Sequence, residues 1–145
     1  MEKIKIKFLR PGGQMPTYGT EFSAGADLYA CLEAPVSIAP GQTVKIPTGL
    51  SLELPAGTAG LVFARSSLGT KRGLAPANKV GVIDSDYRGE LMVMLHNHSA
   101  DTQHIAPGER VAQLVVVPVF TPGFVAVEEL SDTLRGEGGF GSTGR

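Results

Sequence analysis

The stretch that decides the fold class is Val36-Ser-Ile-Ala-Pro-Gly-Gln-Thr-Val-Lys-Ile-Pro-Thr-Gly-Leu-Ser-Leu-Glu-Leu-Pro-Ala-Gly-Thr-Ala-Gly-Leu-Val-Phe63. Turn signals interrupt it at Pro40-Gly41, Pro47-Thr-Gly49 and Pro55-Ala-Gly57. The segments between the turns are β-branched or alternate apolar with polar residues, which predicts short strands. Strands and turns at such short intervals are typical of all-β sandwiches and barrels.

Hydrophobic patterns outside this stretch also favour strands. Apolar residues alternate with lysines over residues 4–8, which predicts a half-buried opening strand. Residues 111–119 form the most apolar strand of the chain, and Val125 and Val127 predict a last short one.

Two further elements carry polar residues of interest. Apolar runs within residues 80–95 flank the polar segment 84–89, which predicts a β-hairpin with a polar tip. The one expected helix covers residues 66–74, with Ser66 or Ser67 as its N-cap.

Length, charge and cysteine content narrow the class of protein. The 145 residues suit one domain, and 42% hydrophobic with 19% charged residues is ordinary for a globular chain. A formal charge of −1 provides no broad basic field, so nucleic acid polymers are not expected as partners. Cys31 is the single cysteine, no apolar run is long enough for a membrane span, and the start lacks an apolar signal segment. We therefore expect a cytoplasmic protein without a membrane partner.

Two isolated polar residues lie among apolar neighbours. Asp27 is the only charge between Glu21 and Glu33, and its carboxylate either caps a turn or meets a ligand. Gln113 lies within the most apolar strand, and its amide needs a partner that is either backbone or ligand.

A helix start beside Arg65 has two possible interpretations. Free N–H groups, serine hydroxyls and a guanidinium would together make a local anion site. Simple capping by a serine, with Arg65 on the surface, is the alternative. At the hairpin tip, Asp84 or Asp86 could act as a base and Tyr87 could supply a flat ring, or all three could serve the turn. Asp84 directly follows the strand, so we expect it to be partly shielded.

The C-terminal segment Arg135–Arg145 contains five glycines, two arginines, two hydroxyl residues and one aromatic ring. Arginine and hydroxyl groups suit phosphate oxygens, and an aromatic face suits a base. One interpretation is a mobile tail that orders on a nucleotide. The other is a frayed chain end.

Five separated stretches, taken together, resemble the trimeric dUTP pyrophosphatase (dUTPase) family in order and spacing. The resemblance covers nearly the whole chain. Its motifs are Ala24-Gly-Ala-Asp-Leu-Tyr29, Ala64-Arg-Ser-Ser-Leu-Gly69, Gly81-Val-Ile-Asp-Ser-Asp-Tyr-Arg-Gly89, Gly108-Glu-Arg-Val-Ala-Gln-Leu114 and Arg135-Gly-Glu-Gly-Gly-Phe-Gly-Ser-Thr-Gly144.

The resemblance implies a homotrimer of jelly-roll-like β subunits with one short helix. Residues 1–134 would form the β domain, and residues 135–145 a flexible lid over the site of a neighbouring subunit. The implied activity is Mg²⁺-assisted hydrolysis of dUTP to dUMP and pyrophosphate. Such an enzyme limits uracil incorporation into DNA and supplies dUMP for thymidylate synthesis.

The resemblance also implies roles for individual residues. Asp84 would activate the attacking water, Arg65 and Asp27 would complete the catalytic set, and Asp27 would meet the metal only through water. The side chains or backbone that would contact the nucleotide are those of Ser66, Ser67, Gly69, Asn78, Tyr87, Gln113, Arg135, Phe140, Gly141, Ser142 and Thr143.

Within these contacts, Asn78 and the hairpin would read uracil, and Tyr87 would pack on the deoxyribose. The tail would grip the γ-phosphate and stack Phe140 on the base. Two other functions stay open, which are a dCTP deaminase of the same architecture and a module that binds nucleotide without turnover.

Overall fold

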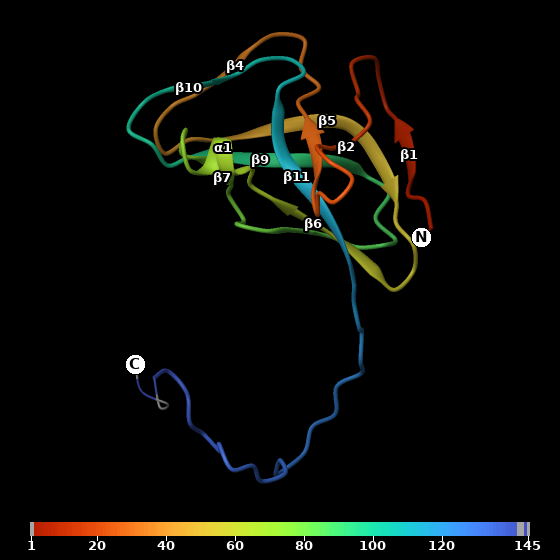
Figure 1. Cartoon of the computed structure of the whole chain (residues 1–145), viewed down its shortest axis with the longest axis vertical. Coiled ribbons are helices and arrows are strands. Elements are labelled where there is room, and N and C mark those ends of the chain that lie inside the picture. The colour runs from red at the N-terminus through yellow and green to blue at the C-terminus, as the bar shows by residue number, and fades with distance from the viewer. Residues whose placement is uncertain (1, 142–143, 145) are drawn as a thin grey trace.

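The computed structural model describes residues 2–141 and residue 144. Strands make up nearly all of its regular structure, as Figure 1 shows. Among the described residues, no helix is both long and apolar enough to cross a membrane. The elements in chain order are β1 (Lys5–Phe8), β2 (Thr17–Tyr18), β3 (Ala26–Tyr29), β4 (Val36–Ile38), β5 (Thr43–Glu53), β6 (Thr58–Phe63), α1 (Ser66–Gly69), β7 (Leu74–Pro76), β8 (Gly81–Ile83), β9 (Glu90–Asn97), β10 (Gln103–Ile105) and β11 (Arg110–Pro118).

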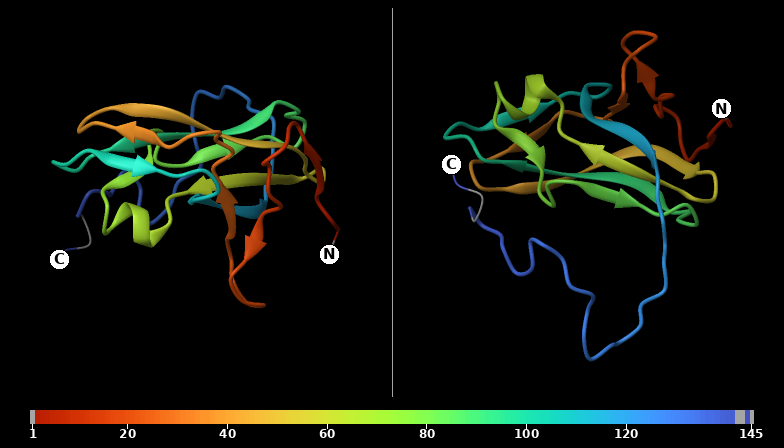
Figure 2. Two further views of the ribbon diagram at one scale, coloured as in Figure 1. Left: turned by 90° about the horizontal axis from the view of Figure 1, so that it is seen from above. Right: turned by 60° about the horizontal axis from the view of Figure 1, so that its bottom comes forward.

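The strands form two main antiparallel sheets whose inner faces share one hydrophobic core (Figure 2). One sheet has the order β1-β5-β9-β7, the other has the order β2-β3-β11-β6-β8, and β4 pairs with β10 beside them. Core residues come from both sheets, for example Leu28 and Leu114 from one and Ile46 and Leu95 from the other. This arrangement confirms the predicted all-β, jelly-roll-like fold with one short helix.

Strand β9 shows why the sequence folds this way locally. Leu91, Val93 and Leu95 are buried, whereas Met92 and Met94 between them are exposed. Alternate side chains of a strand point to opposite faces, so this pattern directs one face into the core.

The predicted turn at Pro47–Gly49 is wrong. Strand β5 runs through it without reversing, and its register against β9 shifts between Pro47 and Ser51. The fully buried Thr48 hydroxyl donates to the carbonyl of Leu91 at 2.6 Å, and Gly49 adopts a φ of 71°. The proline and glycine therefore mark a bulge within a long strand, a position where both residue types also occur.

The predicted hairpin over residues 80–95 is also wrong, although both of its strands exist. Strand β8 pairs with β6 in one sheet, and β9 pairs with β5 and β7 in the other. The polar segment between them is a crossing from one sheet to the other. Apolar runs on either side of a turn predict two strands, but they do not show which strand each one pairs with.

The predicted helix over residues 66–74 ends after one turn. Its N-cap position is Arg65, without a side-chain capping hydrogen bond, and not Ser66 or Ser67. Gly73 takes a φ of 66° and Leu74 begins β7, so the backbone leaves the helical region at this point. Serine, threonine and glycine are weak helix formers, which agrees with this early end.

No strand forms at Val125–Val127 among the described residues, so that prediction is wrong. After β11 the chain leaves the two sheets as a long arm, drawn in blue at the bottom of Figure 1. Phe120, Phe124 and Leu134 on the arm are almost fully exposed. A strand at 125–127 would need a neighbouring strand, and the body offers none to this segment.

The bulge generates a stability prediction. Alanine at Gly49 would adopt a left-handed φ, and its Cβ would lie 2.9 Å from the Cys31 Sγ atom. Gly57 has a similar φ of 79° but open space around it, so Gly57→Ala is the matched control. We expect a backbone cost of about 1–2 kcal/mol for both variants. Gly49→Ala should lose about 1–3 kcal/mol more through overpacking.

Urea unfolding at one fixed protein concentration measures both costs. Equal losses in the two variants would show that the contact between residue 49 and Cys31 does not constrain the bulge.

Candidate functional site

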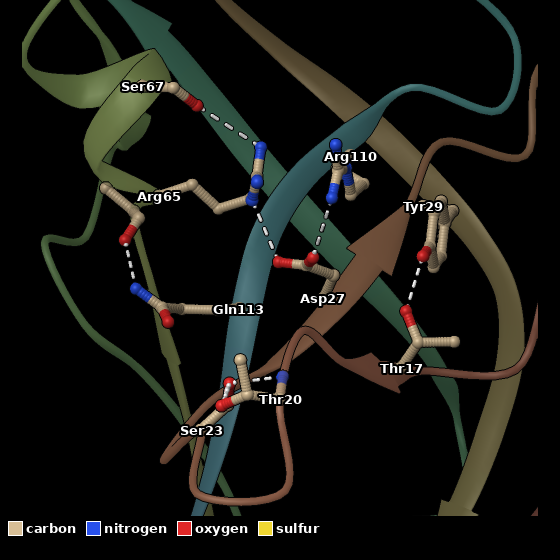
Figure 3. Close-up of polar contacts among 10 residues, drawn as sticks. Thr17, Thr20, Ser23, Asp27, Tyr29, Arg65, Ser67, Arg110 and Gln113 are labelled. Carbon is tan, nitrogen blue, oxygen red and sulfur yellow. Dashed lines mark hydrogen bonds and ion pairs between the residues drawn. The ribbon is translucent and has the colours of Figure 1, made fainter.

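The carboxylate of Asp27 is the centre of the site, because it binds two arginines at once (Figure 3). Its Oδ1 atom accepts a hydrogen bond from the Arg65 Nε at 2.8 Å, and Oδ2 accepts one from the Arg110 Nη1 at 3.3 Å. The Asp27 side chain is 15% exposed. Of the two sequence interpretations, turn capping does not apply, since Asp27 lies within β3.

Arg65 is held from two sides. It pairs with Asp27 through Nε and donates from Nη1 to the Ser67 hydroxyl at 3.2 Å. Figure 3 shows the guanidinium extended between the start of α1 and β3. Ser66 and Ser67 are both exposed at this end of α1. A surface arginine that only flanks a capped helix would not show this pairing.

Gln113 lies beside the same cluster. In the β11–β3 ladder it is opposite Asp27, and its Nε2 donates to the carbonyl of Ala64 at 2.9 Å. A backbone partner is therefore present. A Cβ at Gly25 would lie 2.3 Å from the Gln113 Oε1, so only glycine leaves room for this amide. Gly25, two residues before Asp27, thus allows the close approach of the Gln113 amide.

A cleft of about 350 Å³ opens next to this cluster. Arg72 in its wall pairs with Glu109 and also donates to the carbonyl of His104. Cations outnumber acids in the wall, so the cleft suits anionic groups such as phosphates. The lining residues are Arg65, Ser67, Leu68, Lys71, Arg72, Glu109 and Arg110.

Arg110 is a charged member of the site to which the sequence analysis gave no role. A regular ladder would place Val111 opposite Tyr29, but a register shift between Arg110 and Ala112 places Arg110 there instead. This bulge is the reason that Arg110 reaches Asp27. The sequence offered one signal, since Arg110 is the charged residue at the start of the most apolar strand.

The segment Asp84–Gly89 carries the other predicted site residues. Asp84 and Asp86 are both exposed, so the expected shielding of Asp84 is wrong for the single chain. The segment follows Ile83, the last residue of β8, so Asp84 lies beyond the paired part of that strand. The Tyr87 hydroxyl donates to the carbonyl of Glu90 at 2.9 Å, and the residue is 44% exposed.

Asn78 lies at a second, smaller cleft of about 110 Å³, which is lined mainly by apolar residues of β8 and β9. Next to it, Lys79 has a φ of 67°, and the Val80 N–H donates to the Asn78 carbonyl at 2.7 Å. A non-glycine residue at positive φ is strained, and such strain gathers at functional sites. The turn therefore presents the Asn78 side chain on a constrained backbone.

Within one chain, the structure does not bring the residues around Asp27 (the Asp27 group) together with the predicted site residues of the segment Asp84–Gly89 (the Asp84 group). Phe63, at one end of β6, lies in register with Gln113 and, through it, with Asp27. At the other end of β6, Gly60 pairs with Ile83 of β8, and Asp84 is the residue that follows Ile83. The two groups are thus separated by about four residues along the sheet, which is roughly 13 Å.

The tail residues lie on the arm, outside the two sheets. The Arg135 Nε donates to the carbonyl of Gly138 at 2.6 Å, and Phe140 is fully exposed with a φ of 49°. Gly141 also has a positive φ, of 94°. Ser142 and Thr143 lie outside the described residues. Hydrogen bonds of the described arm beyond Val119 stay within the arm itself.

The fold and the site together define an all-β sandwich protein with a cationic cleft suited to phosphate groups. The dUTPase family model matches residues 12–144 of the chain. A deoxyuridine 5'-triphosphate nucleotidohydrolase of Desulfitobacterium hafniense is 51% identical over 145 residues, covering 98% of this chain and 96% of its own. The enzyme of the same name from Citrobacter koseri is 50% identical over 150 residues, covering 100% and 99%.

Solved structures agree. The Staphylococcus bacteriophage 80alpha dUTPase with dUPNHPP has a TM-score of 0.91 and 29% identity over the full length of both chains. A mutant dUTPase from phage phi11 of S. aureus, whose structure reveals the coordination of a structural Mg(II) ion, has a TM-score of 0.80 and 25% identity, covering 88% of this chain and 98% of its own. The chain therefore belongs to the dUTPase family.

The site geometry generates a prediction about the Asp27 pairs. A double-mutant cycle of Asp27→Asn with Arg65→Gln should give a coupling free energy of about 1.5 kcal/mol, because that pair is short and shielded. The matched cycle with Arg110→Gln should give less than about 1 kcal/mol, because Arg110 is half exposed and its contact is longer.

Denaturant unfolding of the three single variants, the two double variants and the wild type supplies both coupling energies. A larger coupling to Arg110 than to Arg65 would contradict the proposed order of the two pairs.

Proposed function

We propose that this protein is a dUTP diphosphatase, which hydrolyses dUTP to dUMP and pyrophosphate. The observation that carries the proposal is the paired arginine cluster on Asp27, found in a chain of the dUTPase family. The relatives named deoxyuridine 5'-triphosphate nucleotidohydrolase support the substrate. In the cell this reaction would keep uracil out of DNA and supply dUMP for thymidylate synthesis. A single cysteine, Cys31, fits a cytoplasmic location.

The cationic cleft would hold the triphosphate. Arg65 and Gln113, with Ser66, Ser67 and the backbone at Gly69, would contact the phosphates around the scissile α,β linkage. Since Asp27 already orients the Arg65 guanidinium, little reorganisation is needed when the phosphates bind. Donors fixed in advance are worth more to a charged transition state than donors that must first turn.

Asp84 would act as the general base. Its carboxylate would take a proton from a water molecule whose oxygen attacks the α-phosphorus. The bond from that phosphorus to the bridging oxygen then breaks, and the electron pair leaves with pyrophosphate. Asp84 is exposed in the single chain, so water has access to it.

Uracil and deoxyribose would be read at the second cleft. Asn78 and the backbone near β8 would pair with the uracil edge, and Tyr87 would pack on the sugar where a 2′-hydroxyl would clash. On the arm, Arg135, Ser142 and Thr143 would grip the γ-phosphate. Phe140 would stack on the base next to Gly141.

The donor set fits a Mg²⁺ ion that is held mostly by the substrate. The described residues contain no group of three histidine, cysteine or acidic side chains that could hold a metal. Both Asp27 oxygens already accept from arginines, so Asp27 would meet the ion only through water. Mg²⁺ usually keeps several waters and binds phosphate oxygens, and when bound it would neutralise phosphate charge.

A homotrimer with sites shared between subunits would resolve the separation of the two residue groups. The Asp84 group of one chain could then meet the Asp27 group of a neighbour across a subunit boundary. The exposed apolar side chains of the arm, such as Phe120 and Phe124, also favour burial against another copy. We propose residues 1–134 as the β domain and residues 135–145 as a lid that closes over a neighbouring site.

The substrate is tested by pyrophosphate release from dUTP, dTTP, dCTP and UTP in the presence of Mg²⁺. We expect dUTP to be strongly preferred, because the proposed site excludes both the 2′-hydroxyl and other bases. Comparable rates on all four nucleotides would contradict the proposal. Ammonia release from dCTP would instead identify a deaminase.

The base is tested by comparing Asp84→Asn with Asp86→Asn. Loss of proton transfer in Asp84→Asn should lower kcat about 10²–10⁴-fold. Because an amide keeps the shape of the site, KM for dUTP should change little. Steady-state kinetics of both variants decide the point. If Asp86→Asn is the variant that loses turnover, the base is Asp86 and not Asp84.

A further inference from the structure

The segment Asp84–Gly89 is fastened at its far end by side chains outside the five motifs. Ser51 on β5 is 8% exposed, and its hydroxyl donates to the carbonyl of Arg88. Glu90 lies opposite Ser51 in the β5–β9 ladder and accepts a hydrogen bond from the Arg10 Nη2 at 2.8 Å. Two residues from the N-terminal half of the chain thus hold the residues on either side of Gly89, Ser51 through the Arg88 backbone and Arg10 through the Glu90 side chain.

The Arg10–Glu90 pair is more than a surface contact. The Glu90 side chain is only 11% exposed, whereas the Arg10 side chain is 41% exposed. The hydrogen bond to Glu90 is the main cause that raises the pKa of the Arg10 guanidinium above its ordinary value. Loss of Arg10 would leave this shielded carboxylate without its partner, which favours a shift of the Glu90 backbone.

The Tyr87 ring depends on the same backbone. Its hydroxyl donates to the main-chain carbonyl of Glu90, and a Cβ on Gly89 would lie 2.4 Å from that hydroxyl oxygen. The ring therefore lies directly against Gly89, and its position follows the carbonyl of Glu90. Arg10 binds the side-chain carboxylate of Glu90, the residue whose carbonyl receives the Tyr87 hydroxyl, and Ser51 binds the carbonyl of Arg88 on the other side of Gly89.

We propose that Arg10 and Ser51 are positioning residues that set the discrimination between deoxyribo- and ribonucleotides. The inference rests on the proposed function, in which Tyr87 packs on the deoxyribose. A 2′-hydroxyl would be excluded by steric contact, so the exclusion requires that the Tyr87 ring cannot move away from the sugar. A site of this kind needs its contacting groups held to a fraction of an ångström by supporting residues.

The test is the ratio of kcat/KM for dUTP to kcat/KM for UTP in Arg10→Gln and in Ser51→Ala. We expect this ratio to fall on the order of tenfold in each variant, because the ring gains freedom. Arg10→Lys keeps a charged donor and should give an intermediate ratio. Gly89→Ala pushes the ring directly and should give the largest loss.

Lys5→Gln is the matched control, since it removes the exposed Lys5–Glu53 pair of 3.2 Å on neighbouring strands without touching the segment. Its ratio should equal that of the wild type. Thermal unfolding of every variant separates loss of positioning from loss of fold.

The outcomes separate the two proposals. A wild-type enzyme without preference for dUTP over UTP would overturn the proposed function and this inference with it. A wild-type preference that survives unchanged in folded Arg10→Gln and Ser51→Ala would overturn the positioning role alone. A fall of equal size in Lys5→Gln would also overturn it, since any lost surface charge would then have the same effect.

Discussion

The register of β6 in its sheet is the constraint on which the site depends. Phe63 at one end lies in line with Gln113 and Asp27, and Gly60 nearer the other end lies opposite Ile83, which precedes Asp84. Antiparallel hydrogen bonding fixes this offset, and the core behind β6 prevents a slip, because a shift by one residue would turn every buried side chain outward. The residues proposed to bind phosphate and those proposed to read uracil are therefore kept apart within one chain.

Electrostatics on the Asp27 side explain how a nearly neutral chain can bind a strongly charged substrate. The Asp27 carboxylate binds both Arg65 and Arg110, so the three side chains together carry a net positive charge. The carboxylate also holds the two guanidinium groups in place. The charge is local, which agrees with a formal net charge of −1 for the whole protein. Local, oriented cations favour a compact polyanion such as a triphosphate over a long nucleic acid.

The fold class could be predicted from the sequence because short β-branched or alternating segments separated by proline and glycine turns are typical of all-β folds. Predictions from the sequence were wrong where the pairing between strands decides the structure. Pro47 and Gly49 look the same in a bulge as in a turn, and the runs around Asp84 do not reveal that β8 and β9 join different sheets. Within the site, Asp27 and Gln113 could be found because they are polar among apolar neighbours. Ser51 could not be found, since its contact with Arg88 depends on the pairing of β5 with β9. Arg110 gave only the signal of a charge at the start of an apolar strand, since a bulge brings it to Asp27.

The central claim is that each site combines the Asp84 group of one subunit with the Arg65 group of another. Subunit mixing of Asp84→Asn and Arg65→Gln proteins, each of low activity alone, tests it most directly. If sites are shared between chains, unfolding and refolding an equimolar mixture should restore roughly a quarter of the wild-type dUTP hydrolysis through random trimers. If both groups act from one chain, no mixed trimer contains an intact site, and a mixture no more active than its components would contradict the claim.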